Sequence, residues 1–241
     1  MSLKVTSYSL TIRENNKQIL ENANLELEPD TVTVILGENG TGKSSFVMSL
    51  LGFEDYERSG SVMINGVETI NMDTFEIARL GLFVSFQSPP EFEGINFEQF
   101  LISAYKAFNQ DTTTSIFKIR KSIKEKIEKV GLSEDFLKRD LNQGFSGGEK
   151  RKAEILQMLV LQPKVAILDE VDSGLDIKSR ARIAEVIREQ AKAGTTFLIV
   201  SHSLEFVRTL EPHRIVELRD RKFNEIEISE IERLHYHHKK S

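Results

Sequence analysis

The order of elements in this chain follows from one short stretch, Gly37-Glu38-Asn39-Gly40-Thr41-Gly42-Lys43-Ser44-Ser45. An apolar, β-branched run, Thr31–Leu36, precedes this stretch, and a segment with helical character, Ser45–Leu51, follows it. Its three glycines let the backbone curl until several N–H groups converge on one anion, and the start of a helix adds partial positive charge there. A strand, a glycine loop and a helix in this order predict a phosphate-binding loop.

Two side chains of this loop have predicted roles of their own. We expect Lys43 to reach the β- and γ-phosphates of a nucleotide and to act in catalysis, and the Ser44 hydroxyl to bind Mg²⁺. The alternative, a glycine-rich turn without a ligand, is disfavoured because the loop spacing and both flanking elements fit the phosphate-loop pattern. The residues predicted to bind the nucleotide are Gly37, Glu38, Asn39, Gly40, Thr41, Gly42, Lys43, Ser44 and Ser45.

The composition is that of a globular protein. With 241 residues, 39% of them hydrophobic and 29% charged, the chain can bury a substantial core in one large or two small domains. It has no apolar stretch of about 18 residues, and residues 1–5 do not resemble a secretory signal, so we expect no direct membrane insertion and a cytoplasmic location. The net charge of −5 argues against a broad nucleic-acid surface, and the absence of cysteine excludes disulfides and thiolate metal ligands within the chain.

Alternating and β-branched segments predict strands along much of the chain. Val5–Ile12 and Ile19–Leu27 flank a turn and predict a β-hairpin. Further strands are predicted at Ser61–Ile64, Leu82–Phe86, Lys164–Leu168 and Thr195–Val200.

Helical periodicity appears between these strands. Residues 95–141 carry apolar residues at helical spacing, as in Phe97–Phe108 and Ile116–Val130, and predict a helical insert. Another helix is expected at Ile177–Lys192, capped by Asp176 and closed near Gly194. Strands that alternate with helices predict an α/β fold with a mostly parallel sheet that is covered on both faces.

Polar residues follow several of the predicted strands, at the edge where parallel strands end together. Asp169 is placed to hold Mg²⁺, directly or through Ser44, and Glu170 could polarise a water molecule for attack on the γ-phosphorus. His202 could hydrogen-bond the γ-phosphate, and Gln87 ends a strand at the same edge. The alternatives are a helix-capping turn for the two acids, a solvated turn for His202 and a water-facing side chain for Gln87.

A second glycine cluster, Gly144–Arg151, precedes a helical stretch and predicts a second anion-binding helix start. With it the chain resembles the ATP-binding-cassette (ABC) ATPases. The matching motifs are Walker A (37–45), the Q-loop (Gln87), the signature Ser146-Gly147-Gly148-Glu149, Walker B (165–170), the D-loop (173–176) and the switch residue His202.

The resemblance to ABC ATPases implies a division of roles. ATP and Mg²⁺ are the expected cofactors; Glu170, His202 and Lys43 are the expected catalytic residues. The nucleotide would also contact Gln87 and the signature, Ser146, Gly147, Gly148 and Glu149, while Ser44, Gln87 and Asp169 would bind the metal. It further implies an ATP-dependent head-to-tail dimer, in which the signature of one copy closes over the ATP on the other.

Within the ABC ATPases the chain is most similar to the SufC-type ATPases of SUF iron–sulfur cluster assembly. The similarity lies in residues 86–95, 144–150, 156–158 and 168–177, including the D-loop Asp172-Ser173-Gly174-Leu175-Asp176. It implies SufB- and SufD-like partner proteins that dock near residues 87–105. The alternatives are an ATP-binding subunit coupled to a membrane permease, and a DNA-acting ABC ATPase, which the absence of long coiled coils and basic surfaces disfavours.

The resemblance covers nearly the whole chain and implies one ABC ATPase domain over residues 1–241. Within it we expect a catalytic α/β core with an antiparallel β part (1–87 and 162–228), a helical subdomain that carries the signature (88–161) and a polar tail (229–241). The tail contains His235 and His237. We expect these histidines to be solvated rather than to bind a metal.

The sequence also predicts a weak preference for the nucleotide base. Many ABC cassettes stack adenine on an aromatic residue of the first hairpin, and the alternation of the first strand puts Ile12 at that position. An aliphatic contact discriminates less between bases than an aromatic stack does. We expect similar kcat/KM values for ATP and GTP in steady-state assays, and a strong preference for ATP would contradict this prediction.

Overall fold

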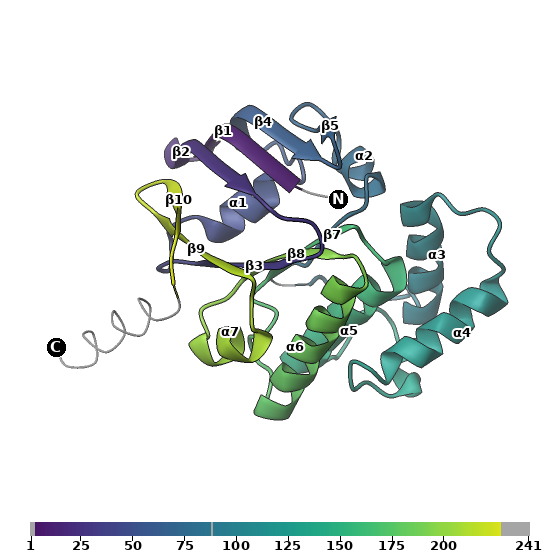
Figure 1. Ribbon diagram of the computed structural model, residues 1–241. Coiled ribbons are helices and arrows are strands. Elements are labelled where there is room, and N and C mark those ends of the chain that lie inside the picture. The colour runs from purple at the N-terminus through teal and green to yellow at the C-terminus, as the bar shows by residue number, and fades with distance from the viewer. Residues whose placement is uncertain (1–2, 88, 228–241) are drawn as a thin grey trace.

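The strand that leads into the phosphate loop lies inside a mostly parallel sheet (Figure 1). The computed structural model describes residues 3–87 and 89–227, and in this part of the chain a six-stranded sheet has the order β10-β9-β3-β8-β7-β6. All neighbours in it are parallel except β10, which pairs antiparallel with β9. The strands are β3 (Val32–Leu36), β6 (Leu82–Val84), β7 (Val165–Asp169), β8 (Thr196–Val200), β9 (Arg214–Arg219) and β10 (Lys222–Glu225).

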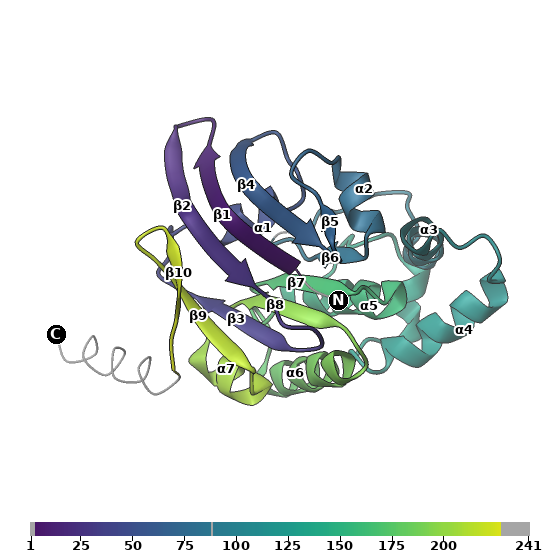
Figure 2. The same ribbon diagram turned by 45° about the horizontal axis from the view of Figure 1, so that its top comes forward.

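Both faces of this sheet are buried, because alternate side chains of its central strands enter different cores. In β7, Ala166 and Leu168 pack with the helices below the sheet, whereas Val165 and Ile167 pack with the elements above it. Figure 2 shows several helices on one side of this sheet and a second sheet on the other. These near-continuous apolar strands explain why the parallel sheet was predictable.

The second sheet contains four strands among the described residues, in the order β2-β1-β4-β5, and is antiparallel. It covers helix α1 (Lys43–Ser49), which begins at the phosphate loop (Figure 2). Tyr8 is fully buried between the layers, where its hydroxyl donates to Ser49 Oγ at 2.9 Å. The strands are β1 (Leu3–Ile12), β2 (Lys17–Glu26), β4 (Tyr56–Ile64) and β5 (Val67–Glu68).

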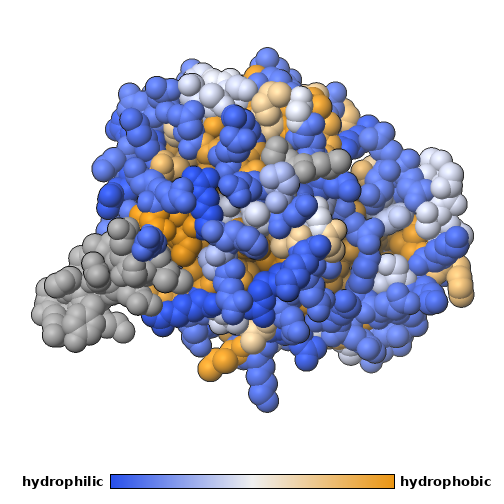
Figure 3. Space-filling view, viewed as in Figure 1, coloured by the Kyte–Doolittle hydropathy of each residue, from blue (hydrophilic) through white to orange (hydrophobic). Residues whose placement is uncertain are grey.

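The short helix α2 (Thr74–Arg79) lies on the same side as the second sheet, where Ile77 joins its core. The remaining helices lie on the other face of the parallel sheet and at one side of it (Figure 1). The segment between β6 and β7 contains α3, α4, the 3₁₀ helix η1 and α5, whose apolar faces share one core with α6 and α7. These elements are α3 (Phe97–Asn109), α4 (Ile116–Ile127), η1 (Glu134–Lys138), α5 (Gly147–Leu161), α6 (Ile177–Lys192) and α7 (Leu204–Leu210). The outer surface in this view is mainly hydrophilic, with separate apolar patches (Figure 3).

The expected α/β fold is confirmed, with differences at the ends of elements. The first hairpin forms as predicted, but β4 begins at Tyr56 rather than at Ser61, because it pairs with β1 over most of its length. The predicted strand Leu82–Phe86 ends at Val84, since the Phe86 N–H bonds to a helix carboxylate rather than to a neighbouring strand. Asp176 caps α6 as expected, accepting the Ser179 N–H at 2.7 Å.

None of the helices in the described ranges has the length and apolar character needed to cross a bilayer. The predicted polar tail (229–241), with its histidines, lies outside the described residues.

The antiparallel sheet supports the phosphate loop through one close contact. Gly42, the residue before α1, has φ +102°, and a Cβ added to it would lie 2.2 Å from Ile19 Cγ2 of β2. Gly40, in the same loop, has φ +82° and nothing within 4 Å of such a Cβ. Of these two glycines, Gly42 alone combines a left-handed backbone with a steric limit.

We expect Gly42→Ala to destabilise the nucleotide-free protein by about 2–4 kcal/mol, because backbone strain and overpacking add. Gly40→Ala, the matched control, should cost only the strain, about 1–2 kcal/mol. Denaturant unfolding of both variants measures this difference. In an Ile19→Ala background the effect of Gly42→Ala should shrink towards that of Gly40→Ala, and equal costs in the wild-type background would contradict the steric account.

Candidate active site

The glycines of the phosphate loop allow its sharp turns, and Lys43 donates hydrogen bonds to two carbonyl groups of the loop. Gly37, Gly40 and Gly42 have φ values of +150°, +82° and +102°, so the loop turns sharply before α1 begins at Lys43. The ammonium group of Lys43 donates to the Gly37 and Glu38 carbonyl oxygens, both at 2.8 Å. Burial lowers the pKa of Lys43, and the nearby Glu170 and Asp169 carboxylates partly offset this effect.

Asp169 lies at the carboxyl end of β7 and is fully buried. Asp169 alternates in phase with Val165 and Ile167 along β7, so its side chain is on the same face of the sheet as theirs. This face packs against the layer that contains α1 and Ser44. Neither carboxylate oxygen has a hydrogen-bond partner within the described residues. Burial raises the pKa of Asp169, and the neighbouring Ser44 hydroxyl lowers it in part. An unpartnered buried carboxylate beside a hydroxyl is a donor set that fits Mg²⁺.

The Glu170 carboxylate contacts side chains that follow two other strands of the sheet. Its Oε2 accepts from Gln87 Nε2 at 3.0 Å, and its Oε1 lies 2.8 Å from His202 Nε2. Glu170 has φ +52°, which turns its side chain away from the line of β7. The parallel register explains the meeting, since Asp169 pairs with Val200 in β8 and Val84 pairs with Ile167 in β7. The structure thus brings together Gln87, Glu170 and His202 from three separate segments.

Two buried serines hold the strand ends in place. Ser85 Oγ accepts the Asp169 N–H at 2.9 Å and so joins β6 to β7. Ser201 Oγ donates to Asp172 Oδ1 at 3.0 Å and accepts the Ser203 N–H at 3.1 Å, which joins the start of the D-loop to the segment around His202. Burial raises the pKa of Asp172, and the bond from Ser201 lowers it.

The signature residues form a helix start away from the phosphate loop. Ser146 is the N-cap of α5: its hydroxyl accepts the Glu149 N–H, and its own N–H donates to Glu149 Oε2 at 2.7 Å. This bond holds the pKa of Glu149 below its usual range. Gly148 lies against the D-loop, where an added Cβ would be 3.1 Å from the Gly174 oxygen. In the described part of the chain, none of the contacts of Ser146–Glu149 reaches residues 37–45.

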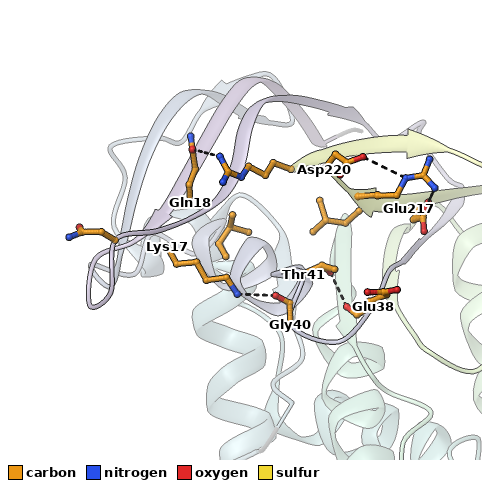
Figure 4. Close-up of a pocket in the computed structure, with 12 residues that line it drawn as sticks. Lys17, Gln18, Glu38, Gly40, Thr41, Glu217 and Asp220 are labelled. Atoms are coloured by element: carbon orange, nitrogen blue, oxygen red, sulfur yellow. Dashed lines mark hydrogen bonds and ion pairs between the residues drawn. The ribbon is translucent and has the colours of Figure 1, made fainter.

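A hollow opens on the outer side of the phosphate loop, between β2 and the β9–β10 hairpin (Figure 4). Glu38, Gly40 and Thr41 line it together with residues of both hairpins, whereas Lys43, Asp169 and Glu170 do not. Lys17 Nζ donates across it to the Gly40 oxygen at 3.1 Å, and Thr41 Oγ1 donates to the Glu38 oxygen at 3.0 Å. Lys17 thus ties the first hairpin to the loop.

The predicted base-contact position, Ile12, is partly buried against the core above the sheet. Its direct partner across the antiparallel pair is Tyr56 of β4. The Tyr56 hydroxyl lies beside the Ser45 hydroxyl, which lowers the Tyr56 pKa, although burial raises that pKa overall. An aromatic side chain therefore stands next to the end of the phosphate loop, supplied by β4 rather than by the first hairpin.

Sequence reasoning missed several residues that shape this site. Ser85, Ser201 and Lys17 support it through contacts between distant segments, for which the sequence holds no local signal. Ser146 and Glu149 were predicted to contact the nucleotide, but their capping of α5 was missed, although serine followed three residues later by glutamate is the capping-box pattern. Two further residues, Arg151 and Glu154, bind the backbone at the Q-loop.

Comparisons with known proteins agree with this fold. Residues 20–173 match the family model described as ABC transporter. A probable ABC transporter ATP-binding protein of Streptococcus pyogenes serotype M3 is 36% identical over 214 residues, covering 88% of this chain and 84% of that protein. The probable ATP-dependent transporter slr0075 of Synechocystis is 35% identical, covering 89% of this chain and 85% of its own.

Solved structures show the same fold. The ATP-binding cassette MJ0796, in a dimeric post-hydrolysis state bound to ADP and Pi, superposes with a TM-score of 0.82 at 20% identity, covering 94% of this chain and 98% of that one. Together with the family match over more than half of the chain, the sequence relatives and the motif order, this places the molecule in one family. The chain belongs to the ABC transporter family and has the fold of its ATP-binding cassettes.

Proposed function

We propose that this chain binds ATP with Mg²⁺ and hydrolyses it, with Glu170 as the general base. The observation that carries the proposal is the position of Glu170, bonded to Gln87 and His202 at the strand ends next to the phosphate loop. Its neighbour Asp169 is buried without a hydrogen-bond partner in the described residues, as expected of a group that needs a ligand. Family membership supports the same activity.

Each group has a defined part in this proposal. Backbone N–H groups of residues 37–45 bind the phosphates, and Lys43 exchanges its two loop carbonyls for phosphate oxygens. Glu170 accepts a proton from the attacking water, whose oxygen bonds to the γ-phosphorus as the bond to the β,γ-bridging oxygen breaks. Gln87 and His202 orient the Glu170 carboxylate, and His202 also donates to the γ-phosphate.

Ser44, Gln87 and Asp169 are the proposed Mg²⁺ ligands, each through an oxygen. When bound, the ion neutralises charge on the phosphate oxygens. The burial of Asp169 without a hydrogen-bond partner for its carboxylate among the described residues supports its assignment.

The signature supports a second copy of this chain as the partner in hydrolysis. Ser146–Glu149 form a helix start that does not touch the phosphate loop of the same chain in the described residues. A head-to-tail pair would bring it to the ATP of the other copy. The related cassette MJ0796 is a dimer in its post-hydrolysis state.

We further propose a SufC-like role, in which ATP-driven dimerisation powers iron–sulfur cluster assembly with SufB- and SufD-like proteins in the cytoplasm. The sequence similarity in residues 86–95 and in the D-loop supports it. The expected docking region (87–105) includes Phe92 and Ile95, large apolar side chains that are 43% and 42% exposed. Without cysteine the chain has no thiolate for a cluster, so the partner proteins carry it.

The second candidate is the ATP-binding subunit of a transporter coupled to a membrane permease. The names of its sequence relatives favour this function, since they describe ABC transporter ATP-binding proteins and an ATP-dependent transporter. Both candidates share the proposed division into a catalytic core (1–87 and 162–228) and a helical subdomain (88–161).

Glu170→Gln distinguishes the two candidates. We expect kcat for ATP to fall at least about 100-fold, because the general base is lost while the phosphate loop is intact. The trapped, ATP-bound protein should elute as a dimer, and affinity purification from the native host should recover SufB- and SufD-like proteins.

Recovery of a membrane permease instead would support the transporter function and contradict the SufC-like role. Undiminished kcat in Glu170→Gln would contradict the proposed site itself.

Asp169→Asn tests the metal assignment by opposite effects on stability and activity. Because burial raises the pKa of Asp169, its charged form destabilises the folded state once the pH exceeds the pKa of the unfolded chain. We expect the variant to gain about 0.5–2 kcal/mol in free energy of unfolding at neutral pH without nucleotide. It should also lose Mg²⁺-dependent ATP hydrolysis. Loss of stability in chemical denaturation would show that the charge is compensated in the folded protein.

A further inference from the structure

A buried ion pair near the start of α5 has a position that the proposed chemistry does not yet explain. Arg151 and Glu154 are only 7% and 3% exposed, and Arg151 Nη1 lies 3.0 Å from Glu154 Oε2. Burying two charges on one helix is costly, and apolar residues of similar volume are often as stable there. Stability alone therefore does not account for this pair.

The hydrogen bonds of the pair converge on the backbone of two residues. Arg151 Nη1 donates to the Phe86 oxygen at 2.7 Å, and Nη2 donates to the Gln87 oxygen at 2.6 Å. Glu154 Oε1 accepts the Phe86 N–H at 2.8 Å. The planar guanidinium can span two adjacent carbonyls and a carboxylate at once, which a lysine ammonium cannot do in the same geometry.

These contacts begin where the sheet stops supporting the chain. β6 ends at Val84, and the Ser85 N–H makes a further bond to the Ile167 oxygen beside it. The next two residues, Phe86 and Gln87, are exposed and have their backbone held by α5 instead. Because the Gln87 side chain reaches Glu170 from this backbone, a small shift of the backbone would change the 3.0 Å contact between them.

We propose that Arg151 and Glu154 are positioning residues that hold Gln87 against Glu170 and make this contact depend on the position of α5. The inference rests on the proposed function, since it assigns Gln87 and Glu170 to ATP hydrolysis. The same helix begins at the signature residue Ser146. In a head-to-tail pair, the helix end that meets the ATP of one copy thus sets Gln87 in the hydrolytic site of the other.

The test is a double-mutant cycle on the full-length chain. Arg151→Met combined with Glu154→Leu removes the pair without leaving a lone buried charge. We expect kcat for Mg²⁺-ATP to fall about 10- to 100-fold while KM stays within about twofold, since the phosphate loop is untouched. In a Gln87→Ala background the same two changes should lower kcat by less than about twofold, because they act through Gln87.

Lys124→Met with Glu134→Leu is the matched control, because it removes an exposed ion pair between α4 and η1 with an N–O distance of 2.6 Å. It should leave kcat unchanged in both backgrounds. Arg151→Lys keeps the buried charge but loses the planar guanidinium that donates to two adjacent carbonyls, and it should give an intermediate kcat. If the Met/Leu variant does not fold, Arg151→Lys decides, and a wild-type kcat in it would overturn the inference.

The outcomes separate this inference from the proposed function. The positioning role would be overturned, and the proposed function left standing, by either of two results. One is that the Met/Leu changes lower kcat by the same factor in the Gln87→Ala background as in the wild type. The other is that they raise KM and leave kcat unchanged. If Gln87→Ala and Glu170→Gln both keep the wild-type kcat, the proposed function fails and this inference with it.

Discussion

The parallel pairing of β3, β8, β7 and β6 is the constraint on which the rest of the structure depends. Parallel strands end at one edge, so the phosphate loop, His202, the acidic pair and Gln87 meet there although up to 165 residues separate Gly37 from His202. Alternation along β7 then directs Asp169 towards α1, while the left-handed backbone of Glu170 turns the next carboxylate towards its neighbours. One register thus gives two adjacent acids different surroundings.

These surroundings carry an electrostatic cost in the nucleotide-free protein. Asp169 is buried and unpartnered among the described residues, and Lys43 is buried against loop carbonyls. Burial lowers the pKa of Lys43 and raises the pKa of Asp169, and both shifts favour the neutral form of the group. The large apolar layers on the two faces of the sheet offset this cost, and a ligand that brings anionic phosphates and a cation would relieve it. Such a site is stabilised by its ligand rather than by its own contacts.

The helical part is joined to the sheet by polar contacts as well as by packing. Arg151 and Glu154 bind the backbone that follows β6, and further along the same segment Lys150 pairs with Glu91 at 2.6 Å. The segment that leads from the sheet into α3 therefore lies along the first turns of α5. Polar contacts of this kind fix direction and register, whereas apolar contacts alone tolerate sliding.

The sequence by itself determined the fold class, the phosphate loop and the polar residues at the strand ends. Local signals carry this information: glycine spacing at 37–42, β-branched runs before Asp169 and His202, and helical periodicity in between. The tertiary structure alone decided which of these residues touch. Three hydrogen bonds join positions that are 64 to 84 residues apart in the sequence. They run from Gln87 to Glu170, from the Asp169 N–H to Ser85, and from Arg151 to the Gln87 backbone. No local pattern encodes such contacts, because they follow from strand register and from helix packing against the sheet.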